Sequence, residues 1–444
     1  MQLADRPDSK ESISLCMVVH NEGETLEKAI LSVIDLVDEI IIGIDRKCTD
    51  NTPEIAKKYA TEWFEFDFNE DFAGTRNKAI KKAKGSLVLI LDGHEWLCEE
   101  GHPLEDSMAS IYHLDPSQQR ILTSVSYLEQ ILDKGFDENF DVACFNICMN
   151  VGDDNIPSLF FLQPRLFRNT GKITYKAKVH NHLEGYDSKR AVGCPEVILI
   201  HTMPANREKK RKIQRKRMNL GGLRADIKKD PNNTRPYFYM GNSYADMGEP
   251  LKAILWYQKY MKLAPSFGEE KYQALQQLGL LYLRHKGDNP KAKEYLLQAM
   301  QVNWRRREPY ILLAEIAFAE KQWDECVHWL KIADNVKAPF TVMFCQGSAY
   351  TYMPIILKMK CYEQLQDWHG AMEAAGDALT WRPGDLSIIA QLEIFKDRIK
   401  TDISKDNHEN FLILDHLGSF TKDLSAMVVK THHVSVRQTL ETRW

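Results

Sequence analysis

The sequence predicts an α/β domain built on a mostly parallel sheet, followed by an all-α solenoid of paired helices. Three observations support this fold class. Short apolar runs alternate with helical spacing over the first hundred residues, which is typical of parallel strands joined by helices. From Arg235 onward, small and aromatic residues recur at the spacing of paired helical repeats. A chain of 444 residues is also longer than one ordinary domain.

Four apolar runs in the first hundred residues are predicted strands, and helical spacing separates them. The predicted strands span 13–19, 39–44, 63–68 and 87–91, and the helices between them lie within 24–37, 52–59 and 71–84. Because parallel strands end at one edge of a sheet, and open α/β sheets bind ligands beyond that edge, we expect a site there.

Polar residues gather at these strand ends. Asn21 and Glu22 follow the first strand, Asp45 ends the second, Arg76 precedes the third helix, and Asp92-Gly93-His94-Glu95 follows the fourth strand. Carboxylates can accept hydrogen bonds from a base or a ribose, and arginine can hold a phosphate with two hydrogen bonds. A divalent metal can bridge a diphosphate. The pattern favours a nucleoside-diphosphate ligand.

The next hundred residues are less regular. We expect a helix at 106–113 and strands at 125–132, 141–149 and 197–200, with a hairpin and a histidine-rich turn within 171–186. We base these expectations on apolar runs that are bounded by polar turns.

The ordered set VVHNE, CTDNT, DFAGTRNKAIKKAKG and DGHE resembles the nucleotide-sugar domain of family 2 glycosyltransferases, which has the Rossmann-like GT-A fold. The resemblance covers roughly residues 13–203. It implies that Arg76 faces the diphosphate or the base and that Asp92 begins the family's DxD motif. The residues implied to line the base and ribose are Val19, His20, Asn21, Glu22 and Asp45.

The sequence departs from the family pattern at His94, which stands where the second aspartate of the motif is expected. Imidazole ligates Mn²⁺, Co²⁺ or Zn²⁺ and is a poorer ligand for Mg²⁺. We expect a divalent metal, Mn²⁺ or Mg²⁺, held by Asp92, His94 and a later histidine, His201. Similar enzymes also carry an arginine-rich strand, here Arg165 to Arg168.

An inverting reaction needs a base that takes a proton from the acceptor. Similar enzymes carry a histidine–acid pair after the hairpin, and here that pair is His180-Asn181, without the acid. The sequence does not choose among the candidate catalytic residues, which are His180, Glu184, Glu95 and the loop residues Asp153 and Asp154.

The segment from Arg207 to Arg217 is rich in basic residues. It is either a solvated helix that links two domains or a patch that attracts a phosphate-rich acceptor. Four repeats of tetratricopeptide type follow, and their concave face typically binds a peptide. The predicted domains are 1–205 (GT-A), 206–234 (basic helical linker), 235–400 (repeats) and 401–444, a C-terminal extension that caps the repeats or dimerises.

The composition is that of a globular protein, with 44% hydrophobic residues and a formal net charge of −4. No apolar run reaches the roughly 18 residues of a membrane span, the N-terminus lacks the apolar core of a secretory signal, and the nine cysteines include no CxxC pair. We therefore expect a cytoplasmic protein without a transmembrane segment.

The expected function is transfer of a sugar, with inversion, from a UDP-sugar to a polypeptide or other macromolecular acceptor presented by the repeats. We expect the partner to be a peptide or protein rather than nucleic acid. Homodimerisation is among the arrangements open to the chain. Two alternatives stay open at this point. One is a transferase acting on modified DNA bases, as in phages. The other is a repeat scaffold with a degenerate GT-A domain, suggested by His94 and Asn181.

Overall fold

The computed structural model describes residues 11–69, 71–113, 124–134, 136, 138–202 and 209–405. The chain forms two compact units. Unit 1 comprises Met1–Trp304 and Ala338–Gly347, and unit 2 comprises Arg305–Lys337 and Ser348–Trp444. None of the helices in these described ranges combines the length and the hydrophobicity that crossing a membrane requires. Almost all of the predicted extension 401–444 lies outside the described residues.

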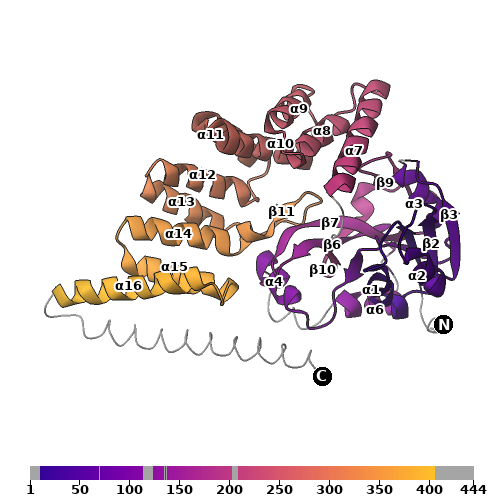
Figure 1. Cartoon of the computed structure of the whole chain (residues 1–444), viewed down its shortest axis with the longest axis horizontal. Helices are drawn as coiled ribbons and strands as arrows, with labels where there is room; N and C mark the ends of the chain where they lie inside the picture. The colour runs from indigo at the N-terminus through magenta and orange to yellow at the C-terminus, as the bar shows by residue number, and fades with distance from the viewer. Residues whose placement is uncertain are drawn as a thin grey trace. The chain divides into compact units, whose positions relative to one another are not determined.

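Unit 1 is built on a mixed sheet (Figure 1). Its strand order is β3-β2-β1-β4-β7-β6-β10-β5. Its first four strands are parallel wherever they pair with one another. They are β1 (Ile13–Val19), β2 (Glu39–Asp45), β3 (Glu62–Phe66) and β4 (Leu87–Ile90). The connecting helices are α1 (Leu26–Leu31), η1 (Ile34–Leu36), α2 (Thr52–Tyr59) and α3 (Phe72–Ile80). The predicted alternation of strands and helices is confirmed.

The strand order reverses at β1. β2 and β3 lie on one side of β1, and β4 lies on the other. At such a reversal the loops that follow the two neighbouring strands diverge and leave a crevice, which is where open α/β sheets bind ligands. The loop after β1 carries Glu22, and the turn after β4 carries Asp92, so both lie at this point.

The second half of the sheet is mostly antiparallel, through the pairs β4–β7, β6–β7 and β5–β10, while β6 and β10 are parallel. Its strands are β5 (Glu95–Leu97), β6 (Val142–Val151), β7 (Pro157–Arg168) and β10 (Ala191–His201). The predicted hairpin is present as a separate two-stranded sheet, β8 (Thr174–Lys176) with β9 (His182–Glu184). The shorter helices here are α4 (Pro103–Tyr112) and η2 (Ser188–Arg190).

The prediction of a strand at 125–132 is wrong, because this segment is helix α6 (Ser124–Lys134). Leu128 and Ile131 are three positions apart and both are buried, with Val125 packed against the same core. A spacing of three places these side chains on one face of a helix, which a strand would split between two faces. Together with α1 and α2, α6 covers one face of the sheet, while α3 and the β8–β9 hairpin cover the other.

Apart from one segment between α13 and α14, the rest of the described chain consists of helices that pack in consecutive pairs, and the predicted repeats are confirmed. Unit 1 contains α7 (Lys209–Lys229), α8 (Arg235–Asp246), α9 (Pro250–Lys262), α10 (Gly268–Leu281), η3 (Tyr282–Lys286) and α11 (Asn289–Val302). Unit 2 contains α12 (Glu308–Ala319), α13 (Trp323–Asp334), α14 (Tyr352–Gln364), α15 (Trp368–Trp381) and α16 (Leu386–Lys405), and η4 (Gly347–Tyr350) precedes α14. Small residues let the paired helices approach. A Cβ atom on Gly241 of α8 would lie 2.5 Å from the ring of Tyr257 in α9.

A segment between α13 and α14, Ala338–Gly347, leaves the helical pattern and belongs to unit 1. Its short strand β11 (Cys345–Gln346) pairs with β7 at Phe160 and Leu159. The backbone N–H of Leu162 also donates to the carbonyl of Thr341 at 2.7 Å. Because β4 pairs only with the far end of β7, at Leu166 to Arg168, this segment covers an otherwise open sheet edge.

A substitution at Gly347 tests whether the packing of this segment on β7 stabilises the protein. A Cβ atom on Gly347 would lie 2.0 Å from the carbonyl oxygen of Pro157, so Gly347→Ala must push the segment away from β7. We expect a loss of about 1–3 kcal/mol in the free energy of unfolding, measured by chemical denaturation. The control is Gly268→Ala, where an added Cβ meets nothing within 4 Å. Equal stability of the two variants would contradict the close packing.

Candidate active site

The loop after β1 is tied to the loop after β2. Asn21 has a left-handed backbone (φ 53°), which asparagine tolerates better than most residues. Its side-chain oxygen accepts the backbone N–H of Thr49 at 2.7 Å, and its amide donates to the Thr49 hydroxyl at 3.1 Å. The backbone N–H of Glu22 donates to the Thr52 hydroxyl at 2.7 Å. Asn21 therefore holds the two loops together.

His20 and Asp45 also lie together at the ends of β1 and β2. His20 Nδ1 is 3.1 Å from Asp45 Oδ2, and the Asp45 carboxylate is buried while the His20 side chain is 46% exposed. The second carboxylate oxygen of Asp45 accepts the backbone N–H of Lys47 at 3.1 Å. Val19 is 1% exposed and its side chain packs in the core. A ligand at this edge would therefore meet Val19 through its backbone.

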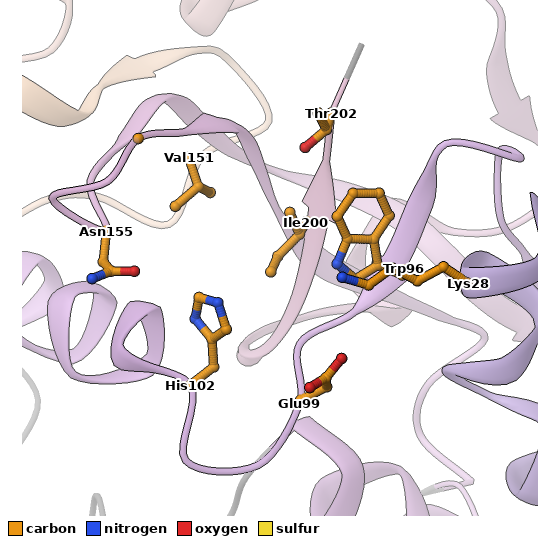
Figure 2. A pocket seen from close by; sticks show the side chains of 9 residues that line it. Lys28, Trp96, Glu99, His102, Val151, Asn155, Ile200 and Thr202 are labelled. Atoms are coloured by element: carbon orange, nitrogen blue, oxygen red, sulfur yellow. The ribbon is translucent and has the colours of Figure 1, made fainter. Parts of the chain in front are cut away.

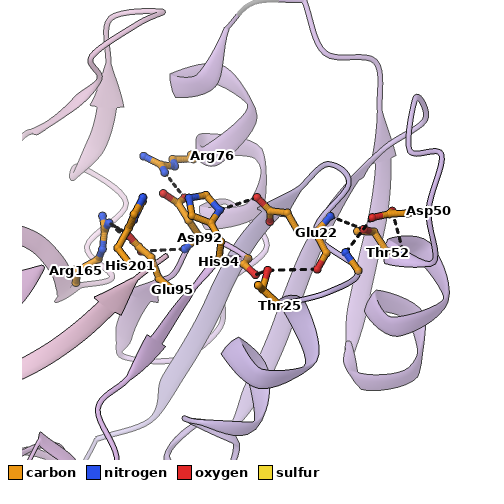
Figure 3. Close-up of polar contacts among 12 residues, drawn as sticks. Glu22, Thr25, Asp50, Thr52, Arg76, Asp92, His94, Glu95, Arg165 and His201 are labelled. Carbon is orange, nitrogen blue, oxygen red and sulfur yellow. Dashed lines mark hydrogen bonds and ion pairs between the residues drawn. The ribbon is translucent and has the colours of Figure 1, made fainter. Parts of the chain in front are cut away.

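Arg76 and Asp92 form the central ion pair of the site (Figure 3). Arg76 projects from α3, and its second terminal nitrogen donates to the amide oxygen of Asn181 at 3.0 Å. Its guanidinium lies 5.1 Å from the centre of the Tyr175 ring. Burial acts to raise the pKa of Asp92, but the charges of Arg76, Arg165 and His94 together hold it well below its usual range. Asp92 is thus a fixed negative charge at neutral pH.

Glu95 is held by a buried ion pair with Arg165 of β7. Nη2 of Arg165 lies 2.7 and 2.9 Å from the two oxygens of Glu95, and both residues are 1% exposed. His201 Nδ1 lies 2.9 Å from Oε1, and the backbone N–H of Asp92 donates to Oε2 at 3.1 Å. Although burial opposes it, the charge of Arg165 lowers the pKa of Glu95. These contacts favour a positioning role for Glu95 over proton transfer.

His94 lies against Glu22, with Nδ1 2.8 Å from Oε1. This contact needs Gly93, because a Cβ atom there would lie 1.9 Å from Glu22 Oε2. The hydroxyl of Thr25 donates to the Gly93 carbonyl at 2.7 Å and fixes the turn (Figure 3). Burial acts to lower the pKa of His94, but the hydrogen bond to Glu22 and the nearby carboxylates raise it overall.

The three predicted metal ligands come together, but their arrangement does not fit a ready metal site. The rings of His94 and His201 lie edge to face with centroids 4.5 Å apart. Asp92 is paired with a guanidinium, and each imidazole uses its Nδ1 on a glutamate. Within the described ranges, no group of three or more histidine, cysteine or acidic side chains is placed to hold a metal ion. Metal binding by these residues stays a prediction.

Of the four other candidate catalytic residues, His180 and Glu184 lie on the β8–β9 hairpin, and Asp153 and Asp154 lie in the turn between β6 and β7. His180 is next to Asn181, which joins it to Arg76, and its ring stacks on Tyr239 of α8 with centroids 3.9 Å apart. Glu184 is exposed, and its carboxylate lies 3.1 Å from His182 Nε2. His180 is thus connected to the Arg76–Asp92 ion pair through its neighbour Asn181.

Sequence reasoning noted Arg165 only as part of an arginine-rich strand, without a partner, and did not single out Tyr175 or Tyr239. An arginine inside the apolar strand β7 was the available signal for Arg165, since a charge buried in a sheet needs a partner. Tyr175 and Tyr239 meet the site only through tertiary packing, and nothing in their local sequence distinguishes them.

A separate cavity of about 250 Å³ lies beside β5, among residues from α1, β10 and the β6–β7 turn (Figure 2). The Lys28 ammonium lies 4.4 Å from the centre of the Trp96 ring. Glu99, His102 and Asn155 line the same space. An indole beside carboxylate, imidazole and amide groups can pack on one part of a ligand and hydrogen-bond another. No motif singled out in the sequence pointed to this cavity.

Comparisons with known proteins agree with this geometry. Residues 14–101 match the family model Glycosyl transferase family 2. The matched segment contains β1 to β5 and includes Glu22, Asp45, Arg76 and Asp92. The chain therefore resembles family 2 glycosyltransferases in its first hundred residues, and paired helices follow later in the chain.

Curated relatives match only part of the chain. A TPR repeat-containing protein of Synechococcus elongatus is 41% identical over 88 residues, which is 20% of this chain and 22% of that protein. The SPbeta prophage-derived glycosyltransferase SunS of Bacillus subtilis is 20% identical over 263 residues, or 59% of this chain and 56% of SunS. The SunS of Bacillus phage SPbeta matches equally. This chain thus spans about half the length of the SunS proteins and about a fifth of the first relative.

Among solved structures, the MamA protein is 19% identical and matches 39% of this chain and 87% of its own, with a TM-score of 0.32. YrrB, described as a TPR protein with an unusual peptide-binding site, is 16% identical and matches 40% of this chain and 84% of its own, also with a TM-score of 0.32. At these TM-scores the likeness is too weak to support an argument.

Arg165→Met tests the buried ion pair. The substitution leaves the Glu95 carboxylate buried without its main counter-charge, and we expect a loss of about 3–5 kcal/mol in the free energy of unfolding. Chemical denaturation measures the change. The control is Arg46→Met, which removes an exposed pair with Glu65 and Asp67 and should leave the denaturation midpoint unchanged. If Arg165→Met lowered the free energy of unfolding as little as Arg46→Met, the buried pair would not be important for stability.

The raised pKa of His94 predicts that the stability of the protein depends on pH. Its folded-state pKa is raised above the ordinary value of about 6.5, so its stabilising contribution is complete below that value. The contribution is lost as the pH rises through the folded-state pKa. The difference in melting temperature between the wild type and His94→Gln should be largest in mildly acidic buffer and shrink toward alkaline pH.

The matched control for this pH series is His369→Gln, at an exposed position of α15. It accounts for the general effect of losing one histidine. A difference between the wild type and His94→Gln that stays constant with pH would contradict the raised pKa.

Proposed function

We propose that this chain is a glycosyltransferase that takes a sugar from a nucleoside-diphosphate sugar. The observation that carries the proposal is the Arg76–Asp92 pair, which lies at the strand-order reversal inside the segment that matches family 2 glycosyltransferases. Open α/β sheets bind nucleotides at such a reversal. The glycosyltransferase SunS, a distant relative over 263 residues, supports the same class of activity.

In this proposal, UDP is the nucleotide and the reaction inverts the sugar. Asp45 and Glu22 accept hydrogen bonds from the base and ribose, and Arg76 binds the diphosphate. His180 takes the proton of the acceptor, because its turn bonds Arg76 through Asn181 and it carries a titratable imidazole. Glu95 and Arg165 hold the Asp92 turn in place.

A divalent metal is part of the proposal only as an additional ligand of the diphosphate. If one is bound, Asp92, His94 and His201 would hold it, and it would neutralise charge on the leaving nucleotide. Calorimetry of UDP with and without Mn²⁺ tests this directly.

The proposed acceptor is a polypeptide presented by the paired helices. Stacked helical repeats form extended surfaces that suit a peptide chain. The alternative of a DNA acceptor rests on Arg207 to Arg217, whose side chains lie outside the described residues. Acceptor binding that weakens steeply with salt would favour nucleic acid. The scaffold alternative predicts no binding of UDP or GDP with any metal.

Arg76→Gln tests the nucleotide site. Because a hydrogen bond to a charged group contributes about 1.5–3 kcal/mol, we expect UDP to bind about 10- to 100-fold more weakly, measured by calorimetry. GDP is measured alongside to establish which base is preferred.

The matched control is Arg190→Gln. Arg190 forms an ion pair with Asp141 at the starts of β6 and β10, away from the edge where the polar loops gather. Its substitution should leave the affinity for UDP unchanged. Equal affinities of wild type and Arg76→Gln would remove Arg76 from the nucleotide site.

A further inference from the structure

The turn between β8 and β9 is held from two sides within unit 1. On the side of α3, the backbone N–H of Phe72 donates to the Lys178 carbonyl at 3.2 Å, and Arg76 donates to Asn181. On the other side, Val179 is 4% exposed. Its apolar cluster includes residues of α7 and α8, namely Leu220, Leu223 and Phe238.

This turn has a backbone that needs outside support. Ala177 (φ 66°) and His180 (φ 50°) are both left-handed. Such conformations are unfavourable for residues with a side chain and persist where the surrounding contacts fix them. The position of the His180 imidazole therefore depends on what packs against the turn.

Tyr239 of α8 packs directly on this imidazole. The two rings are nearly parallel, with an interplanar angle of 14° and centroids 3.9 Å apart. Arg235 fixes Tyr239 in turn, because its guanidinium lies 4.9 Å from the ring centre and donates to the phenol oxygen at 3.1 Å. Arg235 is paired with the buried carboxylate of Glu270 in α10. Contacts thus run without interruption from α10 to the site.

We propose that Tyr239 is a positioning residue for His180, so that the first helical repeat completes the active site. The inference rests on the proposed function, in which His180 accepts the proton of the incoming acceptor. Stacking on Tyr239 sets the plane of the imidazole, and the left-handed turn sets its direction. A ring that loses this support points away from the reacting atoms for part of the time, which slows proton transfer without weakening nucleotide binding.

The test compares Tyr239→Leu, which removes the stacking ring, with Tyr239→Phe, which keeps the ring and removes only the hydroxyl. The matched control is Tyr237→Leu, the same substitution two residues earlier on α8. His180→Gln and the double variant His180→Gln/Tyr239→Leu complete the set. Each full-length protein is assayed for kcat and KM in the hydrolysis of UDP-glucose, with water as the acceptor, and for UDP affinity by calorimetry.

We expect Tyr239→Leu to lower kcat by about tenfold or more, with KM for the UDP-sugar and the affinity for UDP unchanged. Tyr239→Phe should restore most of the rate, and Tyr237→Leu should match the wild type. In the double variant, Tyr239→Leu should add no loss to that of His180→Gln, since residues that act as a unit are not additive.

Full activity of Tyr239→Leu would overturn the inference. So would a loss that Tyr239→Phe does not repair, a parallel loss of UDP affinity, or independent losses in the double variant. Nuclear magnetic resonance of protein with isotope-labelled histidine gives a readout besides activity. The His180 ring signal, assigned by its disappearance in His180→Gln, should lie upfield through the Tyr239 ring and return downfield in Tyr239→Leu.

The two proposals fail in different ways. A wild-type protein that binds no nucleotide and turns over no nucleotide sugar overturns the proposed function. An active wild type with an unshifted His180 signal, or with unaltered kcat in Tyr239→Leu, overturns only the role of Tyr239.

Discussion

The buried ion pair between Glu95 and Arg165 is the interaction on which the site depends. Glu95 is the first residue of β5, and it holds the turn that carries Asp92 through the backbone N–H of Asp92. Arg165 comes from β7, in the antiparallel half of the sheet. The pair therefore joins the segment that resembles family 2 glycosyltransferases to the strands beyond it, and the low exposure of both partners keeps water from weakening it.

Around this pair, opposite charges alternate across the sheet edge. Arg76 and Arg165 lie next to Asp92 and Glu95, and His94 lies next to Glu22. The neighbouring charges lower the pKa of Asp92 and Glu95 and raise the pKa of His94, although burial opposes each shift. Under the proposed function, a nucleoside diphosphate would meet the Arg76 guanidinium already held in place, which would reduce the cost of ordering it.

The first helical pairs, α8 to α11, belong to the same compact unit as the sheet. Val179 and His180 pack on α7 and α8, so a chain cut before Arg235 would lose contacts that shape the turn beside Arg76. The compact division of the chain agrees, because it places α8 to α11 with the sheet. Sequence patterns put a boundary near 235 because helical spacing begins there, and spacing carries no information about which surfaces pack together.

The sequence by itself determined the alternation of strands and helices, the helical pairs and the gathering of Asn21, Asp45, Arg76 and Asp92 at one sheet edge, since these follow from hydrophobic period and strand direction. Tertiary structure decided the rest. Segment 124–134 became a helix because Leu128 and Ile131 meet the same core. Glu95 forms its ion pair with Arg165, and the ring of His180 stacks on Tyr239. These contacts join residues 59 or more positions apart, and only the packing of the folded chain brings them within a few ångströms.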